Sequence, residues 1–167
     1  RLPSLGIELR YISQLGDNLE QLTSAFRSAL ERSDVTLVTG GLGPTQDDLT
    51  REAIAAALGE QMEVDPALAT QLESFFQTRG TFMPPSNLKQ ATRIPSAKTL
   101  PNPRGTAPGW WTERDGKIVI CLPGPPAENH SMWEEQVEPQ LAELIEDEVT
   151  ITRNIKTMGM SEGAVDE

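Results

Sequence analysis

The sequence is poor in cysteine, in basic residues and in long apolar runs. A single cysteine, Cys121, excludes an internal disulfide and fits the reducing cytoplasm, where we expect the protein to act. Lysine and arginine number 14 against 25 acidic residues, and the net charge of −11 argues against a surface for nucleic acid or for an anionic membrane. No apolar stretch approaches the roughly 20 residues that a membrane-spanning helix needs. A phosphorylated small molecule remains compatible with this composition, because a divalent cation can offset the charge repulsion.

The chain has 167 residues, enough for one domain with its own core. Residues 7–12 alternate between apolar and polar side chains, and this pattern predicts a strand. Asp17 or Asn18 can cap the helix that follows, whose apolar stripe runs to residue 30, and residues 35–38 predict the next strand. Strand, helix and strand joined by short connections predict a βαβ unit with parallel strands.

Further along the chain, turn residues separate several more periodic segments. The pattern predicts a helix over 49–58 ended by Gly59, and a second helix opened by Asp65-Pro66 with Phe75 and Phe76 in the core. A short helix is predicted around 87–91, followed by a hairpin turned at Asp115-Gly116. The last predicted elements are a helix after residue 126 that Pro139 breaks or kinks and a strand over 147–158. Cys121 is expected to be a buried thiol, and His130, the only histidine, a surface or structural residue.

Residues 39–53, Thr-Gly-Gly-Leu-Gly-Pro-Thr-Gln-Asp-Asp-Leu-Thr-Arg-Glu-Ala, form a glycine-rich loop between a strand and a helix. Glycine lets the backbone approach a ligand closely, and a helix start offers unpaired N–H groups to an anion. The loop matches neither the P-loop nor the dinucleotide-binding glycine pattern. The adjacent carboxylates of Asp47 and Asp48 can cap the helix or hold a cation. We expect at least one of them to have a functional role.

A second strand–turn–helix junction lies at residues 122–128, Leu-Pro-Gly-Pro-Pro-Ala-Glu. If its strand runs parallel to 35–38, both junctions emerge at the same edge of the sheet, where ligands bind in open α/β folds. Residues 81–108 are rich in proline and irregular. They are either a surface excursion or, as we favour for 105–109, a functional loop.

Four blocks of sequence, 40–53, 87–91, 102–109 and 122–128, resemble those of the CinA family of competence/damage-inducible proteins, whose wider relatives include MogA, MoaB and MoeA. The resemblance implies a three-layer α/β/α molybdopterin-binding-like domain over residues 1–147, with a mostly parallel sheet and a β-hairpin. Residues 148–167 then resemble the start of a small KH-like domain. The family's opening strand–loop–helix unit and its C-terminal deamidase domain have no counterpart in these residues, so nicotinamide mononucleotide deamidation is not expected.

The resemblance further implies a homodimer with a metal-dependent pyrophosphatase activity that converts ADP-ribose to AMP and ribose 5-phosphate. In those terms Asp47, Asp48 and Glu52 are catalytic, with Asp47 and Asp48 also holding Mg²⁺, Mn²⁺ or Co²⁺. The general base is Asp47 or Glu52, or Glu52 serves only the helix dipole. The residues implied in phosphate or substrate binding are Thr39, Gly40, Gly41, Gly43, Lys89, Arg104, Gly105, Thr106, Pro123, Gly124 and Pro125.

Two other functions stay open from the sequence. One is a molybdopterin binder or adenylyl transferase of the MogA type, and the other is a non-enzymatic domain that serves assembly or regulation in competence and DNA-damage responses. Leu42 stands where the MogA-like loop commonly has threonine, and the aspartate pair that follows is a feature of the CinA pattern. Both features favour the pyrophosphatase.

Overall fold

The computed structural model describes residues 1–145, 156, 158 and 159, in two compact units. One unit comprises residues 1–12 with the chain from 140 onward, and it contains the short 3-10 helix η1 (Leu2–Leu5). The other comprises residues 13–139 and contains every strand found among the described residues. The predicted strand 147–158 and the KH-like segment lie almost entirely outside the described residues. Within the described part of the chain, no helix has the length and apolar character needed to cross a bilayer.

The larger unit is built on a mixed sheet of four strands in the order β1-β6-β5-β4. Strands β1 (Val35–Thr39) and β6 (Lys117–Leu122) run parallel, whereas β5 (Gly109–Arg114) is antiparallel to both β6 and β4 (Ala97–Leu100). The predicted α/β class is confirmed, but the sheet is mixed rather than mostly parallel. The reason is the predicted hairpin at Asp115-Gly116, which reverses the chain between β5 and β6, while β4 was hidden in the irregular 81–108 stretch.

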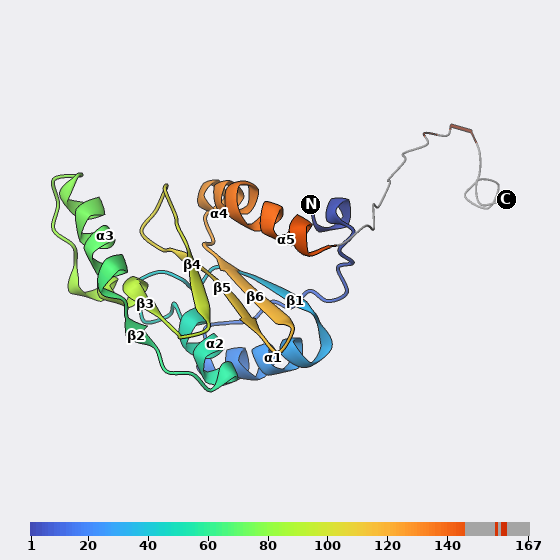
Figure 1. Cartoon of the computed structure of the whole chain (residues 1–167), viewed down its shortest axis with the longest axis horizontal. Helices are drawn as coiled ribbons and strands as arrows, with labels where there is room; N and C mark the ends of the chain where they lie inside the picture. The colour runs from blue at the N-terminus through green and yellow to red at the C-terminus, as the bar shows by residue number, and fades with distance from the viewer. Residues whose placement is uncertain (146–155, 157, 160–167) are drawn as a thin grey trace. The chain divides into compact units, whose positions relative to one another are not determined.

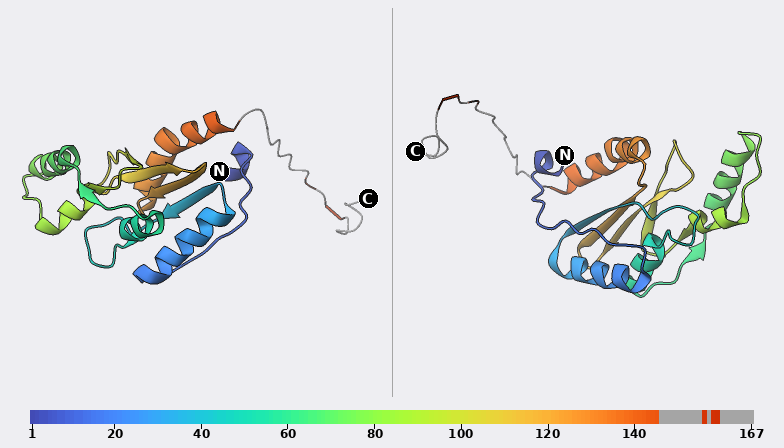
Figure 2. Two further views of the ribbon diagram at one scale, coloured as in Figure 1. Left: turned by 60° about the horizontal axis from the view of Figure 1, so that its bottom comes forward. Right: turned by 180° about the vertical axis from the view of Figure 1, so that it is seen from behind.

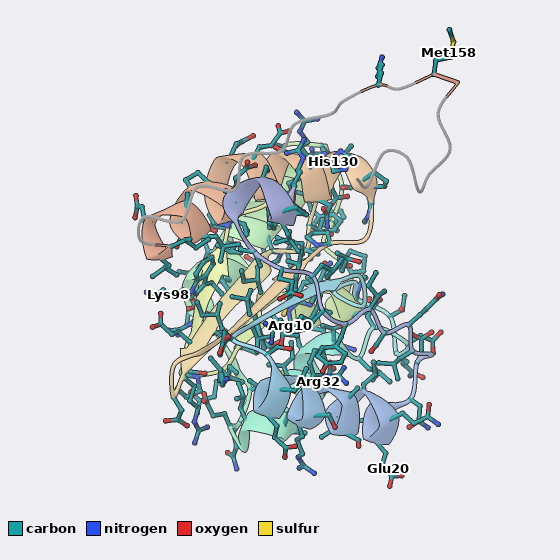
Figure 3. The ribbon with its side chains drawn as sticks, turned by 90° about the vertical axis from the view of Figure 1, so that its right-hand side faces the viewer. Arg10, Glu20, Arg32, Lys98, His130 and Met158 are labelled. Carbon is teal, nitrogen blue, oxygen red and sulfur yellow. The ribbon has the colours of Figure 1, made fainter. Side chains whose placement is uncertain are left out.

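Helices cover both faces of this sheet (Figure 1). Helices α1 (Leu19–Arg32) and α2 (Thr50–Leu58) lie on one face and α4 (Pro126–Met132) on the other (Figures 1 and 2), which confirms the three layers. Figure 3 shows Glu20 on α1 and His130 on α4, on opposite sides of the sheet, and His130 is exposed as expected. The core between these layers contains Ile54, Ile94, Trp110, Val119 and Cys121, each at most 2% exposed. Burial of this apolar surface holds the layers together.

Residues 7–12 do not form the predicted strand, and the predicted βαβ unit is therefore wrong. Leu9, Tyr11 and Ile12 are 54%, 53% and 84% exposed. A strand is stable only when a neighbour pairs with its backbone, and an alternating pattern does not supply that neighbour. The parallel partner of β1 is instead β6, in register from Val35 opposite Ile118 to Thr39 opposite Leu122.

Most of the predicted helix boundaries are confirmed. Asn18, rather than Asp17, caps α1 and accepts a hydrogen bond from the Gln21 amide at 3.0 Å. Asp65 caps α3 (Pro66–Gln77) through the amides of Ala67 and Leu68, and Gly59 ends α2 with φ +67°. The short helix predicted around 87–91 is the 3-10 helix η2 (Pro85–Ala91).

Three details of the helices and strands differ from the prediction or go beyond it. Phe75 and Phe76 of α3 are only half-buried, and Leu72 is the buried residue of that helix. A two-stranded ladder joins β2 (Glu63–Val64) to β3 (Thr92–Arg93). The expected break at Pro139 appears as a π-helical turn, Trp133–Val137, between α4 and α5 (Glu138–Leu144). Proline has no N–H to donate within a helix, and its ring would clash with the carbonyl four residues earlier; a widened turn relieves that clash.

Candidate functional site

The ends of β1 and β6 bring both glycine-containing junctions to one edge of the sheet, as predicted. Thr39 lies opposite Leu122, and the next amide, that of Gly40, donates to the Leu122 carbonyl at 2.9 Å. Immediately beyond, a Cβ placed on Gly124 would lie 3.5 Å from the Gly40 Cα. The loop after β1 and the turn after β6 therefore leave the sheet side by side, at the place where open α/β folds bind ligands.

The loop after β1 is tied to the start of α2 by Thr50. Gly40 and Gly41 have φ values of 91° and 68°, in the region that favours glycine. The Thr50 hydroxyl donates to the Gly40 carbonyl at 2.9 Å, and the Thr50 amide donates to the Gly41 carbonyl at 3.2 Å. A Cβ on Gly41 would overlap the Thr50 hydroxyl. The second glycine is thus required both by its dihedral angle and by the close approach of the helix.

Asp48 organises the same loop from its other side and does not cap α2, whose first residue follows Leu49. Its Oδ2 accepts hydrogen bonds from the Thr45 hydroxyl at 2.6 Å and the Thr45 amide at 3.0 Å. Burial by itself raises the pKa of Asp48, but hydrogen bonds from the Thr45 hydroxyl and from the amides of Gly43 and Thr45, together with the charge of Lys89, outweigh it and hold the pKa below its ordinary value. The carboxylate is therefore kept ionised.

Lys89, which lies in η2, connects this loop to α2. Its Nζ donates to the carbonyl of Thr45 at 3.0 Å and to the carbonyl of Asp48, and it forms an ion pair with Glu52 Oε1 at 2.9 Å. These contacts match the donor capacity of an ammonium group. The predicted contact of Lys89 with a phosphate would require one of them to break. Glu52, beyond any effect on the helix dipole, is thereby an anchor for Lys89.

Arg51 is a site-building residue that sequence reasoning missed. It is 1% exposed, and its two terminal nitrogens donate to the Leu42 carbonyl at 2.8 Å and to the Pro108 carbonyl at 2.9 Å. Its guanidinium also lies 5.8 Å from the Trp110 ring centroid. Desolvation lowers its pKa to about 10, so it remains charged at neutral pH. One buried cation therefore joins the glycine loop to the loop before β5.

Asn102 is the second such residue, and it shapes the loop before β5. Its Oδ1 accepts from the amides of Arg104 and Gly105 at 3.1 and 3.0 Å, and its Nδ2 donates to the Ala107 carbonyl at 2.9 Å and to Glu128 Oε2 at 2.6 Å. Asparagine commonly closes turns in this way, and its place before Pro-Arg-Gly was the available signal. The bond to Glu128 connects this loop to the start of α4.

The predicted site residues thus form two connected groups. In the first group, Lys89 connects Thr45 and Asp48 of the glycine loop to Glu52 of α2. In the second group, the bond between Asn102 and Glu128 connects residues 104–106 to residues 123–128. Thr39, Asp47, Arg104, Gly124 and Pro125 are exposed, Pro123 is buried, and Gly40, Gly41, Gly43, Gly105 and Thr106 are intermediate. Within the described ranges, no three histidine, cysteine, aspartate or glutamate side chains form a metal cage.

The hydrogen bonds of Asp48 predict an acid-sensitive contribution to stability. Because the pKa of Asp48 in the folded protein lies below its ordinary value of 3.8, the contribution is complete only well above pH 3.8 and is lost as the pH falls through the folded-state pKa. We expect Asp48→Asn to be less stable than the parent at pH 7, and the difference to shrink below pH 4. Urea unfolding between pH 7 and pH 2.5 measures this. A difference that is constant with pH would show that the charge of Asp48 contributes nothing.

Comparison with known proteins agrees with the geometry. Residues 1–143 match a family model described as a probable molybdopterin binding domain. A CinA-like protein of Thermomicrobium roseum is 48% identical over 166 residues, which are 99% of this chain and 41% of that protein. A CinA-like protein of Deinococcus deserti is 53% identical over 141 residues, 84% of this chain and 35% of that protein.

Solved structures show the same relation. The protein CinA of Thermoplasma acidophilum, described as of unknown function, superposes with a TM-score of 0.77 at 35% identity, covering 84% of this chain and 82% of that one. A molybdopterin biosynthesis protein from Mycobacterium abscessus shares the fold, with a TM-score of 0.53 at 17% identity. The chain belongs to the molybdopterin-binding-domain family and, within it, to the CinA-like proteins. It spans about two fifths of the length of the curated relatives named above.

Proposed function

We propose that this domain binds a nucleotide through its pyrophosphate at the edge formed by β1 and β6 and, with a divalent metal, hydrolyses ADP-ribose to AMP and ribose 5-phosphate. The observation that carries the proposal is the pairing of the two junctions, marked by the 2.9 Å hydrogen bond from Gly40 to Leu122. The segments that leave the sheet at this edge are the glycine loop, which contains Asp47 and Asp48, and the Pro123–Pro125 turn. Water adds to one phosphorus, and the bridging P–O bond breaks.

The residues present suit a cation that is only partly bound by protein. Mg²⁺ is commonly held by one or two carboxylates, with waters and substrate phosphates completing its shell. The aspartate pair offers such a donor set, with Asp47 exposed and Asp48 kept ionised by its hydrogen bonds. When bound, the metal would neutralise the pyrophosphate and lower the pKa of a coordinated water.

Within this proposal the two candidate bases have different tasks. Glu52 Oε1 is engaged by Lys89, and its Oε2 is buried without a hydrogen-bond partner among the described residues. Asp47 is exposed, so water and substrate can reach it. We therefore assign proton acceptance to Asp47 and the positioning of Lys89 to Glu52. The homodimer implied by the resemblance stays a prediction.

The test is AMP release from ADP-ribose by the 167-residue chain and by a longer version that includes the flanking segments of its relatives, with and without Mg²⁺, Mn²⁺ or Co²⁺. We expect metal-dependent turnover that falls by about 100-fold or more in Asp47→Asn and in Asp48→Asn, because each removes a carboxylate from the reaction site. Glu134→Gln, at an exposed position between α4 and α5, is the control and should retain full activity.

Two other results would replace this proposal. The family description favours a pterin ligand as the alternative, and adenylylation of a molybdopterin without AMP release from ADP-ribose would support it. No turnover by either version with any of the metals, while both remain folded, would favour a binding or regulatory domain.

A further inference from the structure

A cavity of about 180 Å³ lies between α3 and the loop that joins β4 to β5. Figure 1 shows α3 at one end of the sheet, with that loop beside it. Helix α3 contributes Leu68, Leu72 and Phe75 to one wall, and the opposite wall includes Thr99 and Thr106. We call this cavity the α3 pocket. Phe75 lines this pocket and is half-buried, and the Arg79 guanidinium lies 3.5 Å from its ring centroid.

The wall of the α3 pocket carries no acidic or basic side chain among the described residues. Its polar groups are neutral amides and hydroxyls, including those of Gln71, Thr99 and Thr106. An ionised phosphate would lose hydration there with no charged side chain in the lining to compensate, whereas a flat neutral ring can cover the apolar wall and bond to the polar one. The volume is below the roughly 300 Å³ of a site for a whole drug-sized ligand, so it suits a single ring system.

The pocket is preformed, and it adjoins the edge formed by β1 and β6, where we propose that the pyrophosphate binds. The bonds of Asn102 to the amides of Arg104 and Gly105 hold the shape of its outer loop. Gln90 lines the pocket, and its Nε2 also donates to the Leu42 carbonyl at 3.4 Å. The Pro108 carbonyl accepts from Arg51, which also holds Leu42. The inner wall of the pocket and the glycine loop are therefore held by shared residues.

We propose that the α3 pocket is the subsite for the neutral heteroaromatic ring of the nucleotide, with α3 supplying the apolar face and Gln71 a hydrogen bond to the ring edge. The inference rests on the proposed nucleotide site, since it places one part of the same ligand. It assigns the two parts of the ligand to chemically different surroundings. The ring lies in the uncharged pocket beside α3, and the phosphates lie at the glycine loop, which contains Leu42 and the aspartate pair.

The test compares binding of adenosine, AMP and ribose 5-phosphate to the 167-residue chain by calorimetry. Gln71→Phe places a larger side chain at the pocket wall from an exposed position, and Gln77→Phe makes the same change on the same helix outside the pocket. We expect Gln71→Phe to weaken adenosine and AMP by about tenfold and to leave ribose 5-phosphate within about twofold. Gln77→Phe should leave all the affinities unchanged.

A second readout keeps the test independent of folding in the variants. On addition of adenosine to the parent chain, NMR shifts should move for Leu68, Leu72 and Phe75. Equal adenosine affinity in both variants, shifts confined to other residues, or no adenosine binding to the parent chain would each overturn the inference. Adenosine carries no pyrophosphate, so its binding is separate from hydrolysis. Pocket-dependent adenosine binding without AMP release would sustain the subsite and reject the hydrolase. AMP release without pocket-dependent adenosine binding would sustain the hydrolase and reject the subsite.

Discussion

Gly41→Ala is expected to lower the free energy of unfolding by about 3 kcal/mol, from left-handed strain and overpacking together. The residue has φ +68°, and an added Cβ would overlap the Thr50 hydroxyl. Thr50 cannot turn aside without cost, because that hydroxyl donates to the Gly40 carbonyl and the side chain is 5% exposed. Urea unfolding at pH 7 measures the loss, and nucleotide binding should weaken with it.

Gly59→Ala is the matched control for this change. Gly59 has φ +67°, almost the same dihedral angle, but nothing lies within 4 Å of an added Cβ. It should therefore lose only the strain, about 1 kcal/mol. The difference between the two variants isolates the close approach of α2 to the loop. Equal losses would mean that the loop can move away from Thr50, and that the backbone there is not held as tightly as its hydrogen bonds indicate.

Arg51→Met is expected to lower the free energy of unfolding by a similar amount, about 3 kcal/mol. The change keeps much of the side-chain volume but leaves the carbonyl of Pro108 without its charged donor, and that of Leu42 with only the 3.4 Å bond from Gln90. Relief from burying a charge offsets part of this loss. Arg51→Lys should fall between the parent and Arg51→Met, because an ammonium cannot reproduce the planar fork that reaches both carbonyls.

The measurement for Arg51 has a local and a global part. Urea unfolding gives the global loss, and hydrogen exchange should show faster exchange in both loops, 40–48 and 102–109, than in β6. Arg27→Met is the control: Arg27 is exposed and makes one 3.3 Å bond to the Ala56 carbonyl, so its loss should stay within about 0.5 kcal/mol. Uniform exchange changes throughout the domain would reject the assignment of Arg51 as the link between the two loops.

Both predictions concern contacts that lie beyond the reach of local sequence patterns, and sequence reasoning could not supply them. Arg51 lies in a helical segment whose pattern indicated apolar burial at neighbouring positions, and its partners are 9 and 57 residues away. Asp48 shows the same limit at short range. Aspartate before a helix most often caps it, but here the carboxylate accepts its hydrogen bonds from the amide and hydroxyl of Thr45.

The sequence by itself determined the local elements whose causes are local. Asp65-Pro66 at the start of α3, Gly59 at the end of α2 and Asp115-Gly116 in the hairpin each act through their own dihedral angles and nearest hydrogen bonds, and each is confirmed. Only the tertiary structure decided how the strands outside that hairpin pair. An alternating pattern at 7–12 states that a segment can pair but not that a partner lies beside it, whereas the parallel neighbour of β1 comes from residues 117–122. The candidate site depends on that pairing, because it sets two distant loops at one edge.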